Sequence, residues 1–95
     1  MTAYIVFTRK STKDQAELAT YSEMAGRTLA GRPVTPRTFY GRQEVLEGAP
    51  VEGVAILEFP TLDEAKAWYD SPAYRAAREH RFKGADYSVV IVEGV

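Results

Sequence analysis

Three strand-like segments of this chain are apolar on both faces. The stretches AYIVFTR (residues 3–9), VEGVAILEF (residues 51–59) and DYSVVIVEG (residues 86–94) place apolar side chains at odd and at even positions. Strands with this pattern are covered on both sides in a folded protein. A chain of 95 residues with only two helical stretches can cover one face of a sheet by itself. We therefore expect the second face to pack against another apolar surface.

The residues after the first strand predict a helix from Lys13 to Ala30. Thr12 and Gln15 have the spacing of a capping box, in which the threonine hydroxyl accepts a backbone N–H of the first turn. Apolar residues then recur at helical spacing, and Gly31 supplies a stop.

The segment between this helix and residue 51 is predicted to be a loop followed by a strand. GRPVTPRT (residues 31–38) contains two prolines and a glycine, which is typical of a loop. FYGRQEVLEG (residues 39–48) is predicted to be a strand with a bulge at Gly41, and the residues up to Pro50 turn the chain.

The second helix is predicted to be broken. Thr61 and Glu64 form a capping box that opens it. Ser71 is a good N-cap and Pro72 is favoured in the first helical turn, so the helix restarts at this point at a changed angle. Gly84 ends the second segment.

The resulting order of elements is β-α-β-β-α-β. This order predicts an α+β, ferredoxin-like fold, with an antiparallel four-stranded sheet and both helices on one face. We expect residues 1–95 to form one domain. We also expect two copies to pack sheet on sheet as a homodimer, a dimeric α/β barrel, since this supplies burial that so short a chain lacks.

Composition argues against several classes of function. The chain has 12 basic and 13 acidic residues without a block of like charge, so it has no electrostatic footprint for nucleic acid or an anionic membrane. It has no cysteine, no Gly-rich phosphate loop and no HExxH motif, and we predict neither a cofactor nor a metal. Its first residues lack the pattern of a signal peptide, which together with the absence of cysteine predicts a cytoplasmic location.

Four short motifs resemble a known family. They are EVLEG (residues 44–48), EFP (residues 58–60), AWYDSPAY (residues 67–74) and the terminal VEG (residues 92–94). On these motifs the chain resembles the bacterial family catalogued as domain of unknown function 1330, within the dimeric α/β-barrel superfamily. The resemblance implies a ferredoxin-like homodimer and no established activity. The proline-containing segment from Arg32 to Gly41 departs from the shorter glycine-rich turn of many members.

The superfamily includes cofactor-independent quinone-forming monooxygenases, haem-degrading monooxygenases and proteins similar to muconolactone isomerase. Their ligands lie between the sheet and the helices of each protomer. The resemblance therefore implies a cleft at that place, by analogy of fold alone. Haem would need an iron ligand, for which the sequence offers only His80.

His80 and Glu58 are the candidate catalytic residues. His80 is the only histidine and the natural acid or base near neutral pH, although near a helix end it could instead cap carbonyl groups. Glu58 shares a strand face with Val54 and Ile56. It could pair with a cation such as Arg78 or Arg81, shift its pKa upward, reach solvent, or act as a general base or ligand anchor.

Trp68, Tyr69, Tyr74 and Arg78 are the candidate substrate-binding residues. The aromatic side chains could stack on a flat substrate and orient its oxygen atoms, or they could form core. Arg78, with Arg81 and Lys83, could bind the carboxylate or phosphate of a small anion, or could pair with Glu79, Asp86 or a partner chain.

Two functional hypotheses follow. In the first, a homodimer binds a small, partly apolar or aromatic molecule in the sheet-to-helix cleft and turns it over by proton abstraction or cofactor-free oxygenation. In the second, the chain is a non-catalytic dimeric sensing or interaction module. A cavity of a few hundred Å³ with convergent polar groups would distinguish the first from the second.

Overall fold

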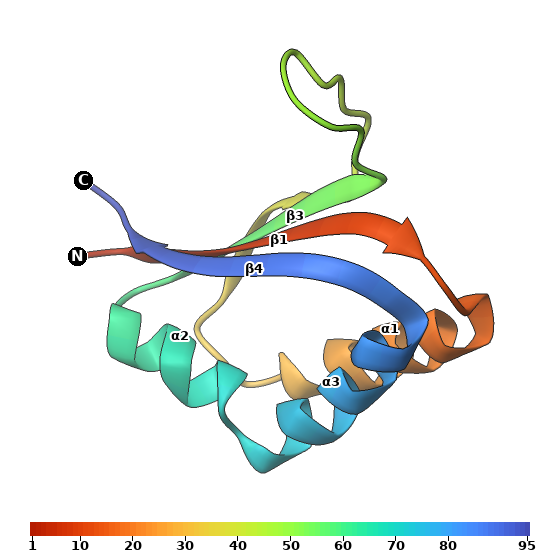
Figure 1. The fold of residues 1–95 in the computed structure, drawn as a ribbon. Helices are drawn as coiled ribbons and strands as arrows, with labels where there is room; N and C mark the ends of the chain where they lie inside the picture. Colours follow the sequence, from red (N-terminus) through yellow and green to blue (C-terminus); the bar gives the residue numbers. More distant parts are fainter.

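The computed structural model describes all 95 residues as a four-stranded antiparallel sheet with three helices on one face (Figure 1). In chain order the elements are β1 (Ala3–Thr12), α1 (Gln15–Thr28), β2 (Thr35–Phe39), β3 (Gly53–Phe59), α2 (Leu62–Tyr69), α3 (Pro72–Gly84) and β4 (Ala85–Glu93). The strand order is β2-β3-β1-β4. The predicted ferredoxin-like fold is confirmed, while the sheet of the single chain is open and not closed into a barrel.

The two faces of the sheet differ in what covers them. Odd-numbered residues of β1 and β3 face the helices and form the centre of the core, namely Ala3, Ile5, Phe7, Ala55, Leu57 and Phe59. Even-numbered residues of the same strands point to the opposite side, where no helix lies (Figure 1). We call this side the open face; its apolar residues are Val6, Val54, Ile56, Val90 and Val92. The strands are therefore apolar on both sides, as predicted, and within the chain the helices cover only one of the two faces.

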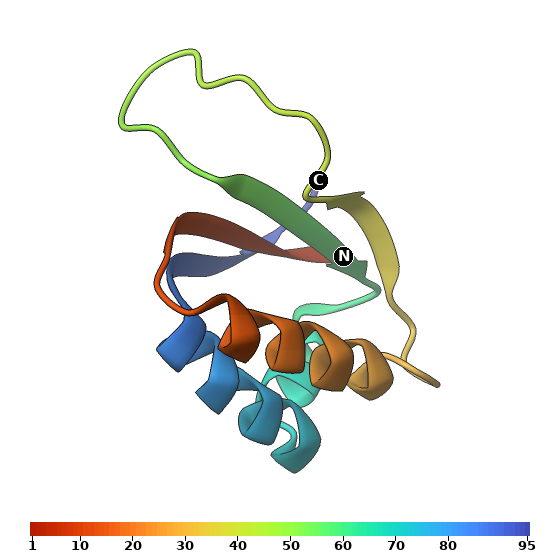
Figure 2. The ribbon, with the colours of Figure 1, turned by 90° about the vertical axis from the view of Figure 1, so that its right-hand side faces the viewer.

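The predicted break in the second helix is confirmed. The hydroxyl of Thr61 accepts the backbone N–H of Glu64 at 3.1 Å and so caps α2. The hydroxyl of Ser71 accepts the backbone N–H of Tyr74 at 3.3 Å and caps α3, in which Pro72 lies at the first position. The break lets α3 turn and lie beside α1 (Figure 2).

The predicted N-cap of α1 is wrong. Thr12 belongs to β1, where it pairs with Ala85, and its hydroxyl donates to Glu52. The cap is Asp14, whose carboxylate accepts the backbone N–H groups of Ala16 and Glu17. Pairing with β4 extends the first strand beyond its apolar stretch and includes Thr12 in it. The helix therefore begins two residues later than the capping box predicted.

The second strand was also predicted at the wrong residues. All of β2 except Phe39 lies in the segment predicted to be a loop, and residues 40–52 form no strand, so Gly41 is not a bulge. The irregularity in the pairing lies between Pro36 and Thr38. β2 is an edge strand, where a proline costs no hydrogen bond of the ladder if its nitrogen faces away from the partner strand. Residues 41–50 instead project from the body as an exposed loop (Figure 2).

Candidate functional site

An apolar cavity of about 160 Å³ lies between α1 and the helix-facing side of the sheet, and we call it the ring cavity. Its apolar walls are Phe7, Leu18, Ala25, Leu29, Phe39, Ala55, Leu57 and Trp68. Small residues of α1 help to leave this space open. A Cβ atom at Gly26, which also lines the cavity, would meet no atom within 4 Å.

Polar groups gather where Tyr40 and Tyr87 line the cavity. The hydroxyls of these two tyrosines share a hydrogen bond of 2.8 Å. The guanidinium carbon of Arg9 lies 4.9 Å from the centre of the Tyr40 ring, and Arg9 Nε donates to Glu52 at 3.1 Å. The ring cavity thus combines apolar walls with three tyrosines, Ser22 and one cation.

The position of Tyr40 depends on two unusual backbone features. Tyr40 has a φ of 57°, in the left-handed region, and is the one residue other than glycine with a positive φ. A Cβ atom at Gly53 would lie 2.8 Å from Cδ1 of the Tyr40 ring. Gly53 is therefore needed for the ring to pack against β3 and reach Tyr87.

Tyr21, Tyr40 and Tyr74 are neutral phenols at physiological pH. Burial raises the pKa of Tyr21 and of Tyr40 far above the ordinary value of 10.0, and the hydrogen bond to Tyr87 raises that of Tyr40 further. Burial also raises the pKa of Tyr74, to about 12. In each hydrogen-bonded pair one hydroxyl donates to the other, so one O–H of the Tyr40–Tyr87 pair is free to donate to a ligand oxygen. Tyr21, Tyr40 and Tyr74 are not available as phenolate bases.

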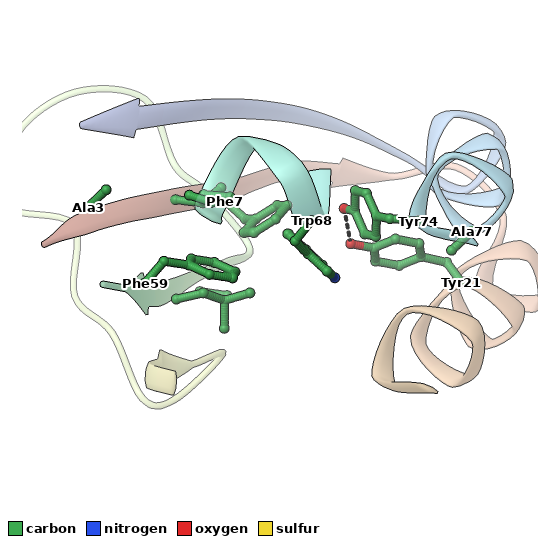
Figure 3. Close-up of a cluster of buried hydrophobic side chains, with 11 residues drawn as sticks. Ala3, Phe7, Tyr21, Phe59, Trp68, Tyr74 and Ala77 are labelled. Carbon is green, nitrogen blue, oxygen red and sulfur yellow. Dashed lines mark hydrogen bonds between the residues drawn. The ribbon is translucent and has the colours of Figure 1, made fainter. Parts of the chain in front are cut away.

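A second tyrosine pair lies in the core next to the cavity (Figure 3). The hydroxyls of Tyr21 and Tyr74 share a hydrogen bond of 2.7 Å. The Tyr74 ring centre lies 4.1 Å from that of Trp68, and Trp68 Nε1 donates to the Thr28 hydroxyl at 2.9 Å. Tyr21 and Trp68 line the ring cavity, whereas Tyr74 supports them from behind.

Of the six candidate residues, only Trp68 lines the ring cavity. Tyr69 instead lies toward β4, where it lines two other hollows and its hydroxyl accepts a hydrogen bond from Arg81 Nη2 at 3.2 Å. The guanidinium carbon of Arg78 lies 4.5 Å from the centre of the Tyr69 ring, outside this cavity. The structure therefore does not bring the predicted substrate-binding residues together around one space.

His80 lies on the surface between α3 and α1. Its Nδ1 lies 2.6 Å from a carboxylate oxygen of Glu17, and about a third of its side chain is exposed. This contact ties the two helices together, and His80 lines none of the cavities.

Glu58 lies on the open face, opposite the sheet-to-helix cleft. It receives two hydrogen bonds from Arg37, from Nε at 3.0 Å and from Nη2 at 3.2 Å. These bonds hold the pKa of the Glu58 carboxyl below its ordinary value. Glu58 therefore pairs with Arg37 and not with an arginine of α3, because the alternation along β3 directs its side chain away from the helices.

Sequence reasoning missed the polar residues of the ring cavity. Arg9 and Tyr87 are cross-strand partners on the face of Phe7, so alternation alone could have placed both beside the core. Tyr40 could not have been found in this way, because it follows a strand whose position was predicted wrongly. No three His, Asp or Glu side chains lie close enough to hold a metal ion. None of the helices is long and apolar enough to cross a membrane.

Comparison with known proteins places the chain in a family without an assigned activity. A family model described as Domain of unknown function (DUF1330) matches residues 2–95. No curated protein matches the chain in sequence.

Solved structures share the fold at low sequence identity. A protein of unknown function from Rhodopseudomonas palustris has a TM-score of 0.75 at 17% identity, over 99% of this chain and 82% of that one. A dimeric ferredoxin-like protein of unknown function from Thermobifida fusca has a TM-score of 0.67 at 15% identity, over 99% and 92%. A variant of SnoaB, a cofactor-independent oxygenase from Streptomyces nogalater, has a TM-score of 0.62 at 10% identity, over 98% and 91%. At these identities the TM-scores establish a common fold and nothing more.

Proposed function

The chain belongs to the family of domain of unknown function 1330, and on this premise we propose that it is a homodimer whose ring cavity binds one small aromatic ring bearing an oxygen atom. The observation that carries the proposal is the composition of the cavity. Its walls are apolar, and its polar lining residues include the hydrogen-bonded Tyr40 and Tyr87 with the Arg9 cation beside them. An apolar space with a few convergent polar groups is the usual form of a small-molecule site.

The volume of the cavity limits the ligand. About 160 Å³ is close to the volume of an engineered apolar cavity, roughly 150 Å³, that binds benzene. It is smaller than the few hundred Å³ that we expected for a substrate cleft. We therefore propose a ligand with a single ring.

The state of the phenols limits the chemistry. The Tyr40 hydroxyl is neutral, and its pair with Tyr87 leaves one O–H free to donate to a carbonyl, phenol or enolate oxygen. Arg9 adds a cation that favours an oxygen carrying negative charge, although its pairing with Glu52 weakens the effect. A ligand that is oxidised without a cofactor, as in the cofactor-independent oxygenase of the same fold, is one candidate class. Binding without turnover is the other.

The homodimer is supported by the open face. Its valine and isoleucine side chains have no cover within the chain, and Val90 and Val92 are each more than half exposed. Two solved proteins of the same fold are described as dimeric. A second copy packed on this face would bury these side chains. Light scattering should then give twice the chain mass of 10.6 kDa, whereas a monomer would contradict the proposal.

Trp68 allows the ring cavity to be tested directly, because it is the only tryptophan and lines the cavity. We expect phenol to cause a saturable change in tryptophan fluorescence. Tyr87→Phe should weaken phenol binding by roughly 2- to 12-fold, the equivalent of one hydrogen bond, and should leave toluene binding unchanged. Tyr4→Phe, outside the cavity, is the control. Consumption of oxygen with a hydroquinone would then distinguish an oxygenase from a binding protein.

The absence of a saturable signal with both phenol and toluene would refute the proposal. The non-catalytic interaction module would then be the better description of the chain.

A further inference from the structure

We propose a second site, separate from the ring cavity, that binds the carboxylate of a small organic acid. It is a hollow of about 380 Å³ between α3, the end of α2 and β4, and we call it the α3–β4 hollow. Its charged lining residues are Lys13, Arg81 and Asp86, and its aromatic lining residues include Tyr69 and Tyr87. α3 runs directly into β4 at this end of the molecule (Figure 1).

Arg81 is a buried cation without a carboxylate partner. The residue is 2% exposed, and none of the four ion pairs of the chain includes it. Its one hydrogen bond goes from Nη2 to the Tyr69 hydroxyl at 3.2 Å. Its Nε is buried and has no acceptor. A guanidinium has five N–H donors, and a buried charge costs free energy unless it is paired.

Aromatic rings contact the guanidinium of Arg81 but do not satisfy its remaining N–H donors. The guanidinium carbon of Arg81 lies 5.1 Å from the ring centre of Tyr87, 5.3 Å from that of Phe82 and 5.7 Å from that of Phe7. Such contacts stabilise a cation in part and keep the plane of the guanidinium in one orientation. They do not replace acceptors in that plane, where a carboxylate binds with two parallel hydrogen bonds.

The charges around the hollow also favour an anion. Lys13 is an exposed cation at the hollow. Arg78, which stacks on the Tyr69 ring, likewise has a buried Nε without an acceptor. Asp86 is the one carboxylate that lines the hollow, and it is exposed and forms no ion pair. The sequence had allowed Glu79 or Asp86 to pair with the α3 arginines, but neither carboxylate forms an ion pair.

The lining selects a carboxylate in preference to a phosphate. Five of the eight lining residues are hydrophobic, and the positive charge comes from one buried guanidinium and the exposed Lys13. A monoanionic carboxylate on a short apolar chain matches both features, whereas a dianionic phosphate requires more donors and more cations. The proposed ligand is therefore a short-chain or branched organic acid.

The Arg81 side chain itself provides the readout. Its buried Nε–H should give a resolved signal in ¹H–¹⁵N NMR spectra of the full chain, assigned by its loss in Arg81→Met. We expect hexanoate to shift this signal in a saturable way, and hexanamide, its neutral analogue, to leave it unchanged. Arg81→Met should weaken hexanoate binding, measured by calorimetry, at least about tenfold, and Lys13→Gln should weaken it less.

The same experiment distinguishes this site from the ring cavity. Trp68 does not line the α3–β4 hollow, so hexanoate should leave its fluorescence unchanged. Tyr87 lines both spaces, so a Tyr87 variant would not distinguish the two sites. If Arg81→Met does not fold, the wild-type Nε–H signal and Lys13→Gln still test the proposal.

Three results would overturn the proposal. Equal binding of hexanoate and hexanamide would show that charge is not recognised. A response to inorganic phosphate but not to hexanoate would assign the site to a phosphate ligand. An unresponsive Arg81 signal, together with dissociation of the dimer in Arg81→Met, would show that the partner chain supplies the missing carboxylate.

Discussion

Removing one hydroxyl of the buried pair between Tyr21 and Tyr74 should destabilise the protein more than its single hydrogen bond suggests. Tyr74 is 0% exposed and Tyr21 is 8% exposed, and their hydroxyls lie 2.7 Å apart. Tyr74→Phe leaves the Tyr21 hydroxyl without its partner beside the core, and Tyr21→Phe does the same to Tyr74 (Figure 3). Each variant therefore adds an unsatisfied polar group to a lost hydrogen bond.

The expected loss of stability is set by the hydroxyl that is left unpaired. A buried donor or acceptor left unpaired costs about 1–3 kcal/mol. We expect each single variant to lose about 1–3 kcal/mol of the free energy of unfolding. The double variant removes both hydroxyls and leaves none unpaired, so its loss should be close to that of one single variant and well below the sum of the two.

Urea unfolding at one fixed protein concentration, followed by far-ultraviolet circular dichroism, measures all four proteins of this cycle. In thermal unfolding, each kcal/mol should lower the Tm by roughly 4–8 °C for a chain of this size. Single variants that lose less than about 0.5 kcal/mol, or losses that add in the double variant, would refute the reasoning. The hydroxyls would then be reached by water or by other partners.

Two further predictions concern packing and pH. A Cβ atom in Gly84→Ala would lie 2.9 Å from the backbone nitrogen of Leu18, so this variant should lose about 1–3 kcal/mol in urea unfolding. Gly26→Ala, with open space at its Cβ position in a helix, should lose nothing or gain up to about 1 kcal/mol, and equal losses in both would contradict the steric argument. Hydrogen bonds from Arg37 lower the pKa of Glu58 in the folded state, so their stabilisation is present above the ordinary value of 4.5 and is lost as the pH falls through the folded pKa. Glu58→Gln should therefore flatten the decline in stability on acidification, and an unchanged pH profile would show that the pair contributes nothing.

The fold could be predicted because its signals are local. The caps at Thr61 and Ser71 depend on hydrogen bonds to a backbone N–H three residues away, so the break in the second helix was visible in the sequence. The order of elements followed from short periodic patterns in the same way. The N-cap of α1 was misplaced because an equally good capping pattern at Thr12 is overridden by strand pairing with β4.

The candidate sites could be predicted only in part, because their residues meet across long stretches of chain. Trp68 was identified as an aromatic residue of the cleft, but Tyr40 and Tyr87 lie 47 residues apart and meet only through the position of β2 and the turn after it. The partner of Glu58 was misassigned for the same reason, because Arg37 lies in the strand that was predicted at the wrong place.

The sequence by itself determined the class of fold, the broken helix and the need to cover a second apolar face. These features depend on alternation and capping, which act between residues close together in the chain. Only the tertiary structure decided which side chains share a cavity and which cation is buried without a partner. Arg81 has the same charge as its neighbours in the sequence, and its burial results from the packing of α3 against β4 and against rings from β1 and α1.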